Sequence, residues 1–457
     1  MSLSTLRAST GVCSGVMTTV KTWVRIGRLG PALLLVLFGV TARPLWADTV
    51  CLLDTEWSAA VERARLVLGA KNTVDVATFI LGDEPFSLTS MAVLRDAARK
   101  GLAVRLLVDA QWNKLPREIQ AHLLESGVQI RQYHPFRLWH PGWLTRRMHD
   151  KLLVADRQAL IAGGRNVESP YFGLGRQLER PDYVDADVLV AGNVVDEAAA
   201  YFDALWSSSE VRTVRSSSRS ERAAREAAQT LDRHFSWLQD RITAVRDTPE
   251  AAEPSCSDVG TVRFFHDPPG KKGKAPGVAD ALAELLEDAQ ESVVIESPYL
   301  VPTKQLRASL LRAVERGMSI RILTNSLAST DNIWPQAAYV GERRWFVENG
   351  IELWEYYGSE SLHAKTAVLD GSVAVVGSFN LDPRSQRLNT ELAVVVDDAE
   401  FAGELRAAMD SHLADSAQIG PDGRPIGFGE RYPKASCGKK LKLFMLRPIA
   451  PLIRGQI

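Results

Sequence analysis

The chain has 457 residues, of which 46% are hydrophobic, so it is long enough to form two or three domains with sizeable cores. Its 54 basic and 55 acidic residues leave a formal net charge of −1, which argues against a dedicated nucleic-acid binder because such proteins normally carry a basic excess. The four cysteines show no paired CxxC spacing. This argues against a structural zinc site, and no metal or other cofactor is expected.

Residues 1–47 have the three parts of an export signal. Basic residues come first, at Lys21, Arg25 and Arg28. An apolar run follows at residues 31–42, too short for a full membrane span, and Ala47 then offers a small residue for cleavage. We therefore expect a signal peptide or membrane anchor, and a protein in the periplasm or on the periplasmic face of the inner membrane. The alternatives are the cytoplasmic face, if the leader is not cleaved, a start at Met17, and a buried N-terminal helix in a cytoplasmic protein.

Export also bears on the cysteines. If the leader is cleaved after Ala47, Cys51, Cys256 and Cys437 enter an oxidising compartment. Three cysteines cannot all pair within one chain, so one of them is expected to stay free. The sequence does not say which two would pair.

Strands and helices alternate in two stretches of the chain, in the same order. In the first stretch we predict a strand at residues 73–81, a helix at 90–100, a strand at 102–108, a helix at 118–128 and a strand at 129–133. The second stretch repeats this order at 292–297, 304–316, 318–323, 342–349 and 351–356. The alternation predicts a mainly parallel sheet, covered by helices on both faces, in each of two pseudo-equivalent α/β domains.

The segments outside this repeat complete the predicted organisation. We predict a leader at 1–47, a first domain at 48–211, a helical linker at 212–260, a second domain at 261–410 and a basic, apolar C-terminal tail at 411–457. Within the tail, residues 439–454 are either an interfacial membrane segment or a segment packed on the second domain. The aromatic insertion at 136–144 is either a lip at the membrane interface or a packed loop. The basic loop at 268–277 either contacts anionic headgroups or is a neutral, solvated loop.

One short pattern occurs twice, as HDKLLVAD at residues 149–156 and as HAKTAVLD at 363–370. Each copy is a His-x-Lys-x4-Asp octamer with the apolar residues of a buried strand. An asparagine within a Gly-rich turn stands at the same offset from the histidine in both halves, at Asn166 and Asn380. A lone histidine or lysine on a strand is more often a core residue. Their joint recurrence, on one face of a strand, favours a single site assembled from two halves around a phosphate.

These residue types supply what phosphoryl transfer needs. Four side chains would bind the non-bridging oxygens: Lys151, Lys365, Asn166 and Asn380. One of the two octamer histidines, His149 and His363, would attack phosphorus as a neutral imidazole. The other, protonated, would donate to the leaving alcohol, and the sequence does not say which does which.

Carboxylates complete the predicted catalytic set. One carboxylate behind each histidine would fix its tautomer, and the candidates are Glu391 and Asp185, which precede the next buried strands. Asp185 lies in the half of the first octamer, and Glu391 lies in the half of the second. Asp156 and Asp370 end the octamers and are counted as catalytic, although their position also suits a structural role that ties strand to turn.

The duplicated octamer is the signature of the phospholipase D superfamily, which the chain resembles from about residue 74 to 396. Within that superfamily it resembles bacterial cardiolipin synthases of the C type, at residues 147–151, 163–166, 171–173, 299–303, 323–328, 361–365, 377–385 and 388–391. The resemblance implies two phospholipase D-like α/β sandwich domains that share one active site, and a two-step exchange without a metal. A phosphohistidine forms with loss of an alcohol, and a second alcohol or water then resolves it.

In such synthases the phosphatidyl group passes to phosphatidylglycerol and gives cardiolipin, which is the function we expect, at a membrane surface. The lipid partners would be phosphatidylglycerol and, as another donor, phosphatidylethanolamine. A hydrolytic phospholipase D that releases phosphatidic acid would use the same chemistry at phosphorus and stays open. The near-neutral charge and the apolar tail disfavour a nuclease, and two intact octamers disfavour a catalytically dead membrane scaffold. No nucleic-acid partner is expected, and the working unit is expected to be a monomer.

Overall fold

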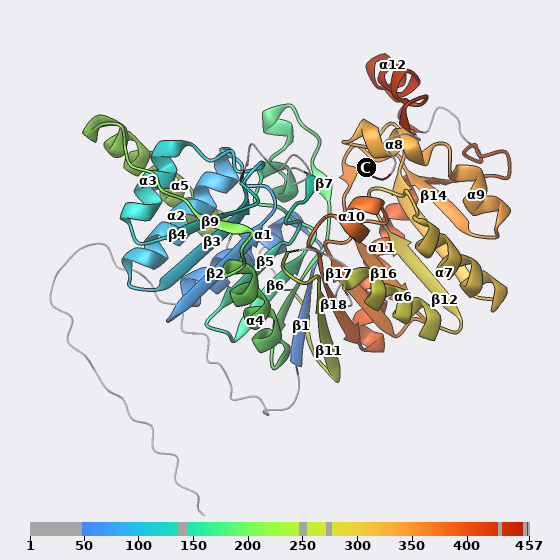
Figure 1. Cartoon of the computed structure of the whole chain (residues 1–457), viewed down its shortest axis with the longest axis horizontal. Helices are drawn as coiled ribbons and strands as arrows, with labels where there is room; N and C mark the ends of the chain where they lie inside the picture. Colours follow the sequence, from blue (N-terminus) through green and yellow to red (C-terminus); the bar gives the residue numbers. More distant parts are fainter. Residues whose placement is uncertain are drawn as a thin grey trace, which may run out of the picture. The chain divides into compact units, whose positions relative to one another are not determined.

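A computed structural model of the chain describes residues 48–135, 145–245, 254–270, 277–427, 432–450 and 455 (Figure 1). These described residues form one compact unit. The predicted leader, the aromatic insertion at 136–144 and most of the basic loop at 268–277 lie outside the described residues. None of the helices described in these ranges is both long enough and apolar enough to cross a bilayer.

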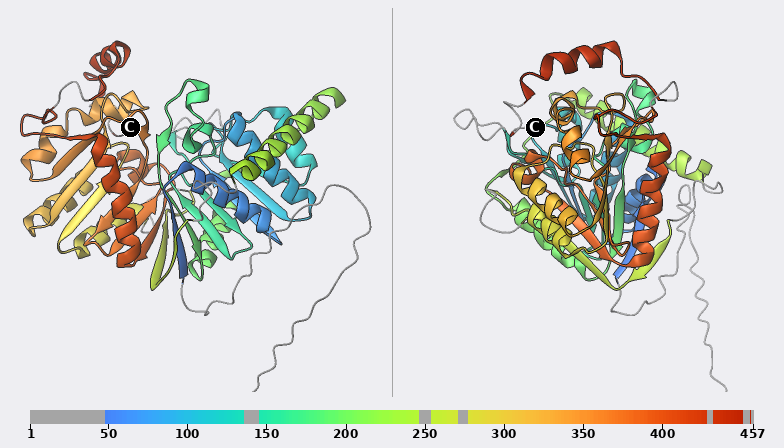
Figure 2. Two further views of the ribbon diagram at one scale, coloured as in Figure 1. Left: turned by 180° about the vertical axis from the view of Figure 1, so that it is seen from behind. Right: turned by 90° about the vertical axis from the view of Figure 1, so that its right-hand side faces the viewer.

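The first half of the chain builds a nine-stranded sheet (Figures 1 and 2). In the order in which they lie across the sheet, its strands are β10 (Cys256–Val259), β1 (Asp48–Leu53), β8 (Asp187–Ala191), β6 (Ala159–Gly163), β5 (Leu152–Ala155), β2 (Thr73–Thr78), β3 (Ala103–Asp109), β4 (Gln129–Tyr133) and β9 (Val211–Thr213). The accompanying helices are α1 (Glu56–Gly69), α2 (Pro85–Arg99), α3 (Arg117–Glu125), α4 (Val194–Trp206) and α5 (Glu221–Val245).

The second half builds an eight-stranded sheet. Its strands, again in spatial order, are β11 (Thr261–His266), β18 (Leu392–Asp397), β17 (Val373–Gly377), β16 (Thr366–Leu369), β12 (Ser292–Glu296), β13 (Ser319–Asn325), β14 (Glu352–Tyr356) and β19 (Ser416–Gln418). The accompanying helices are α6 (Val278–Asp288), α7 (Lys304–Glu315), α8 (Ile333–Tyr339), α9 (Arg343–Glu348), α10 (Pro383–Arg387), α11 (Ala399–His412) and α12 (Cys437–Leu446).

Apart from β10, the two sheets have the same strand order, so the predicted pair of pseudo-symmetric α/β domains is confirmed. The prediction of a mainly parallel sheet is wrong. Within the two sheets as described, β2–β3–β4 and β12–β13–β14 pair in parallel, whereas the other neighbours pair antiparallel. Both faces of each sheet are covered, so the antiparallel strands are as continuously apolar as the parallel ones. A continuous apolar run therefore does not reveal whether a strand is parallel or antiparallel to its neighbours.

The two sheets share a hydrophobic core. Leu152 and Val154 of β5 belong to a cluster that also contains Val368 of β16 and Val394 of β18. Leu153, on the opposite face of β5, packs instead in the cluster of α1 and α2, as the two-residue period of a strand requires. The short strands β7 (Tyr183–Val184) and β15 (Ser361–Leu362) add a parallel pairing between the halves. The buried apolar contact therefore fixes the two halves against each other.

The segment predicted as a linker contains α5, which packs against α2 and α3 of the first half. Strand β10 also falls within that segment, yet it pairs with β1 at the edge of the first sheet. Most of β9 falls there too and pairs with β4. We propose that the first domain includes both strands. The remaining domain boundaries stay a prediction.

Asp156 and Asp370 lie at the far end of β5 and β16 from the octamer histidines. Asp156 accepts the main-chain N–H groups of residues 71–73 at 2.6–2.8 Å, and Asp370 accepts those of residues 290–292 at 2.8–2.9 Å. Both adopt left-handed backbone, with φ of 52° and 49°. The two aspartates were predicted to be catalytic, and from these contacts we propose that they are structural instead. Each one ties its strand to the residues that open β2 or β12.

A disulfide joins Cys51 of β1 to Cys256 of β10, across 205 residues of sequence. The two residues are directly paired in the antiparallel ladder. Among the described residues, Cys437 is the free cysteine, and it is exposed. The bond holds the edge strand β10 onto β1 of the first sheet.

We expect the Cys51→Ser, Cys256→Ser double variant to lose about 2–4 kcal/mol of unfolding free energy, because the long loop between the cysteines gains freedom in the unfolded chain. Urea unfolding without reductant measures this, with Cys437→Ser as the control that should unfold like the parent. Equal midpoints for the double variant and the parent would show that the bond does not form.

We expect Asp370→Ala to lower the unfolding free energy by about 1–3 kcal/mol, because three main-chain N–H groups lose their acceptor, while turnover at low temperature persists. Asp370→Asn, which keeps an acceptor oxygen and tolerates the left-handed backbone, should lose less. Urea midpoints and turnover are measured on the same samples. A folded Asp370→Ala variant of normal stability and no activity would restore the catalytic assignment.

Candidate active site

A cavity of about 660 Å³ lies between the two halves and takes its walls from both. Phe79 and Tyr299, which follow the carboxyl ends of β2 and β12, both line it. The structure also brings together in its walls the two predicted histidines and the two predicted asparagines, His149, His363, Asn166 and Asn380. The equivalent strand ends of two pseudo-symmetric sheets thus meet around one space, and this is why residues so distant in sequence can form one site.

His149 is held by the segment that leads into β18 of the second half. Its main-chain N–H donates to the carbonyl oxygen of Thr390 (3.0 Å), and its ring Nδ1 lies 2.9 Å from Glu391 Oε2. The Glu391 carboxylate is buried and also accepts from Ser378 Oγ and Asn389 Nδ2. A carboxylate can only accept, so Nδ1 of His149 carries the proton and Nε2 is the basic nitrogen.

His363 is held in the same way by the first half. Its main-chain N–H donates to the carbonyl oxygen of Val184 (2.7 Å), and its Nδ1 lies 2.6 Å from Asp185 Oδ2. The glycine pair before Asn166 makes room for this carboxylate, because a Cβ at Gly164 would lie only 1.9 Å from Asp185 Oδ1. The Gly-Gly turn of the first half thus serves the histidine of the second.

The two halves exchange their carboxylates. Glu391 follows the octamer of His363 in sequence but orients His149, and Asp185 follows the octamer of His149 but orients His363. This corrects the sequence-based association of Glu391 with the surroundings of His363. In both cases the main-chain N–H of the histidine also donates to the carbonyl oxygen of the residue that directly precedes the orienting Glu or Asp. Neither half contains a complete site.

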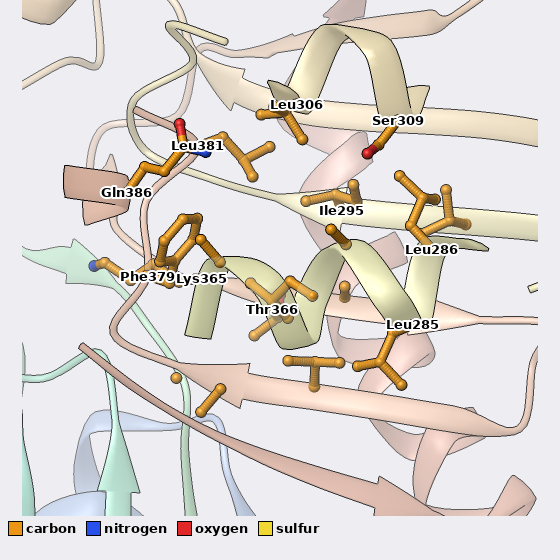
Figure 3. A pocket seen from close by; sticks show the side chains of 18 of the residues that line it. Leu285, Leu286, Ile295, Leu306, Ser309, Lys365, Thr366, Phe379, Leu381 and Gln386 are labelled. Carbon is orange, nitrogen blue, oxygen red and sulfur yellow. The ribbon is translucent and has the colours of Figure 1, made fainter. Parts of the chain in front are cut away.

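The octamer lysines are not among the described residues that line the catalytic cavity. Lys151 Nζ donates to the carbonyl oxygen of His149 (2.6 Å), and Lys365 Nζ donates to that of His363 and lies 3.7 Å from Asp185. Figure 3 shows Lys365 beside a separate apolar cavity of about 100 Å³, near α6 and α7. Lys151 lines a similar cavity of about 310 Å³ beside α1 and α2. Their predicted contact with phosphate requires both side chains to turn, and it stays a prediction.

Burial sets the charge states of these groups. Burial, opposed by Glu391, lowers the pKa of His149 to about 4. Burial and the neighbouring Lys365 lower the pKa of Lys151 to about 7. Burial alone would raise the pKa of Glu391, but His149 and Lys151 outweigh it and hold that pKa at about 2. The pKa of His363 is likewise lowered by burial. Near neutral pH His149 is therefore a neutral imidazole, and each histidine ring has a buried carboxylate behind it.

Asn166 reaches the histidine of the other half through a tyrosine. Its Nδ2 donates to the hydroxyl group of Tyr171 (2.9 Å), which lies 3.3 Å from His363 Nε2. Sequence reasoning missed Tyr171 as a site residue, although the repeat holds a signal for it. Tyr171 stands at the same offset from Asn166 as Ser385 does from Asn380, and Ser385 Oγ accepts the N–H of Asn380 (3.1 Å).

Sequence reasoning also missed most of the charged side chains of the cavity. Among the described residues, the basic ones are Lys114, Arg147, Arg180 and Arg384, and the acidic ones are Glu168, Asp331 and Asp382. Apart from Glu168 and Asp382, at equal offsets from the two asparagines, they follow no repeat that the sequence could reveal. The basic surplus suits an anionic phosphate. No group of three or more His, Cys, Asp or Glu side chains in the described ranges is placed to hold a metal ion.

This fold and site define an enzyme of the phospholipase D superfamily, since two equivalent α/β halves each bring one His-x-Lys-x4-Asp segment to a shared cavity. The sequence-based recognition of that superfamily is confirmed. The chain belongs to the family described as cardiolipin synthase, PLD-like domain, which matches residues 65–206 and 282–413.

Individual relatives agree with this family. The chain is 33% identical to cardiolipin synthase C of Escherichia coli K12 over 391 residues, which cover 77% of this chain and 81% of that protein. It is 27% identical to cardiolipin synthase A of Pseudomonas aeruginosa over 368 residues, or 79% and 66% of the two chains. The crystal structure of phosphatidylserine synthase from Haemophilus influenzae Rd KW20 aligns with a TM-score of 0.63 at 15% identity, covering 89% and 95%. This last likeness concerns the fold.

We expect binding of a phosphodiester anion to weaken as the pH rises through about 7, the pKa that burial and Lys365 give to Lys151. Below this pH Lys151 is a cation, and above it the anion binds only with uptake of a proton. Dimethyl phosphate keeps one negative charge throughout, so calorimetry in two buffers of different ionisation enthalpy counts the protons. Lys151→Met should bind weakly without that uptake. Parent protein with constant affinity and no uptake would contradict the expectation.

Proposed function

We propose that the protein transfers a phosphatidyl group from one phospholipid to the hydroxyl group of phosphatidylglycerol, and so makes cardiolipin. The observation that carries this proposal is the single cavity in which two histidines each have a buried carboxylate of the other half behind them. The names of the relatives, cardiolipin synthases C and A, support phospholipids as the substrate class. The donor would be phosphatidylglycerol or phosphatidylethanolamine.

In the first step, Nε2 of His149 attacks phosphorus, the bond from phosphorus to the leaving alcohol breaks, and His363 gives its proton to that alcohol. We assign the attack to His149 because its lowered pKa keeps the ring neutral and because no hydrogen bond to a described residue occupies its Nε2. We assign the acid role to His363, whose pKa is lowered by burial and by Lys365, because Asp185 and Asp331 act in the opposite direction and favour the protonated ring. The product is a phosphohistidine.

In the second step, the neutral His363 takes the proton from the hydroxyl group of phosphatidylglycerol as that oxygen attacks phosphorus. The bond between phosphorus and Nε2 of His149 breaks, and both histidines return to their first states. We assign stabilisation of the charge on the non-bridging oxygens to four side chains: Lys151, Lys365, Asn166 and Asn380. Every proton and bond is then accounted for without a metal ion.

Transfer and hydrolysis differ only in the second nucleophile. Among the described residues, six aromatic side chains line the cavity: Phe79, Trp112, Tyr171, Tyr183, Tyr299 and Trp334. An aromatic wall limits access of water to the phosphohistidine, and this favours an alcohol as the acceptor. Hydrolysis to phosphatidic acid remains the alternative that the experiment below separates.

We also propose that the protein is exported and works at the membrane surface, on the side where disulfides persist. The bond between Cys51 and Cys256 supports this location, because such bonds are rare in the reducing cytoplasm. A phosphatidyl donor held in a bilayer requires the cavity to approach that surface. Whether the leader is cleaved does not alter the chemistry.

Purified full-length protein in vesicles of labelled phosphatidylglycerol, with and without phosphatidylethanolamine, should produce cardiolipin. His149→Ala and His363→Ala should each lose turnover of these natural lipids by at least about a hundredfold, the contribution of a single proton-transfer group. Thin-layer chromatography of the products measures both effects. Phosphatidic acid as the sole product would establish the hydrolase, and no turnover of any lipid would exclude both enzymes.

The roles of the two histidines can be separated with phosphatidyl-p-nitrophenol, whose leaving group needs no acid. His363→Asn should release one equivalent of p-nitrophenol and leave a phosphatidyl group on His149, which mass spectrometry of the peptide detects. His149→Asn should give neither the burst nor the adduct. An adduct on His363 in the His149→Asn variant would reverse the assignment.

A further inference from the structure

Helix α12 exposes an apolar surface that nothing in the proposed chemistry uses. Among the large hydrophobic side chains exposed in the described ranges, Leu441, Phe444, Met445 and Ile449 lie within nine residues, whereas the others, Leu68, Trp237, Trp334 and Ile426, are scattered. Phe444 is 77% exposed, more than any other of this set. A cluster of this kind on a soluble surface marks an interaction site.

The same segment is basic. Lys440, Lys442 and Arg447 are exposed, and residues 437–450 contain no acidic residue. The helix has two faces, because Leu443 and Leu446 are half-buried at helical spacing while Leu441, Phe444 and Met445 point outward. Exposed apolar side chains flanked by cations match the acyl boundary and the headgroups of an anionic bilayer.

Helix α12 is also fixed to the wall of the catalytic cavity. Lys439 Nζ donates to the carbonyl oxygens of Ala328 and Thr330, both at 2.7 Å. The helix packs against α8, and the two lie side by side in the fold (Figures 1 and 2). Trp334 of α8 lines the cavity and is itself 44% exposed. The contact couples the position of α12 to the cavity mouth.

We propose that α12 is an interfacial anchor, which binds the surface of an anionic phospholipid bilayer and holds the mouth of the catalytic cavity against it. The binding goes beyond the proposed function and does not depend on turnover. Charge complementarity identifies the occupant, because residues 437–450 carry three exposed cations and no acidic residue. The structure thus supplies an anchor near the site, separate from the leader.

A probe placed on the helix tests the proposal even if the leader also binds membranes. Phe444→Cys, in full-length protein with Cys13→Ser and Cys437→Ser, is labelled with an environment-sensitive fluorophore. Vesicles of phosphatidylglycerol and phosphatidylcholine should shift its emission to the blue, and nitroxide-labelled lipids should quench it. The same label at Ile426→Cys, an exposed apolar position outside α12, should respond to neither.

Charge is tested with matched variants. Lys440→Gln and Lys442→Gln should each raise the vesicle concentration for half-maximal response by roughly fivefold, whereas Lys71→Gln and Lys100→Gln, also exposed, should leave it unchanged. A probe at residue 444 that stays accessible to a water-soluble quencher with vesicles present would overturn the proposal. So would a shift that follows protein concentration without vesicles, because it would identify a second copy of the chain as the occupant. Failure of lipid turnover with normal insertion would reject only the proposed function.

Discussion

The site depends on one constraint: each catalytic-cavity histidine is oriented by a carboxylate of the opposite half. His149 needs Glu391, and His363 needs Asp185. The side-chain bonds can form only if the two sheets pack in one register, which the shared core of both sheets provides. Main-chain hydrogen bonds impose the same register, since the main-chain N–H of each histidine donates to the carbonyl oxygen of the residue just before the carboxylate that orients it. The packing of the halves and the geometry of the site are therefore a single structural property.

Burial strengthens the interaction within each histidine–carboxylate pair. A histidine and a carboxylate at the surface would interact weakly through water, whereas the side chains of His149 and Glu391 are 8% and 0% exposed. In this setting burial lowers the pKa of both Lys151 and Lys365, Lys365 lowers that of Lys151 further, and the carboxylates of Glu391 and Asp185 oppose these effects. A phosphate that entered between the two halves would bring the negative charge that this arrangement of lysines favours. The same burial keeps the His149 imidazole neutral, the form that a nucleophile requires.

The sequence predicted much of this architecture because the chain contains the same pattern twice. Repetition identified the two α/β halves, both histidines and both asparagines. It could not reveal strand direction, since β5 and β6 are antiparallel yet as apolar as a buried parallel strand. It also could not show that Asp185 and Glu391 each bind the histidine of the opposite half, because proximity in sequence suggests the histidine of their own half. The charged wall around Arg180 was missed for a related reason: it depends on how loops outside the repeat meet in space.

The unequal roles proposed for the histidines have a basis within the octamers themselves. The residue after His149 is Asp150, whereas Ala364 follows His363. Asp150 is buried and accepts hydrogen bonds from Tyr201 and from the hydroxyl group of Thr390, whose carbonyl oxygen binds the N–H of His149. The first octamer is therefore joined to the lead-in of β18 by side chain and main chain together. Ala364 has no polar side chain to add such a bond. A more firmly held His149 suits a nucleophile that must return to one position after each phosphohistidine is resolved.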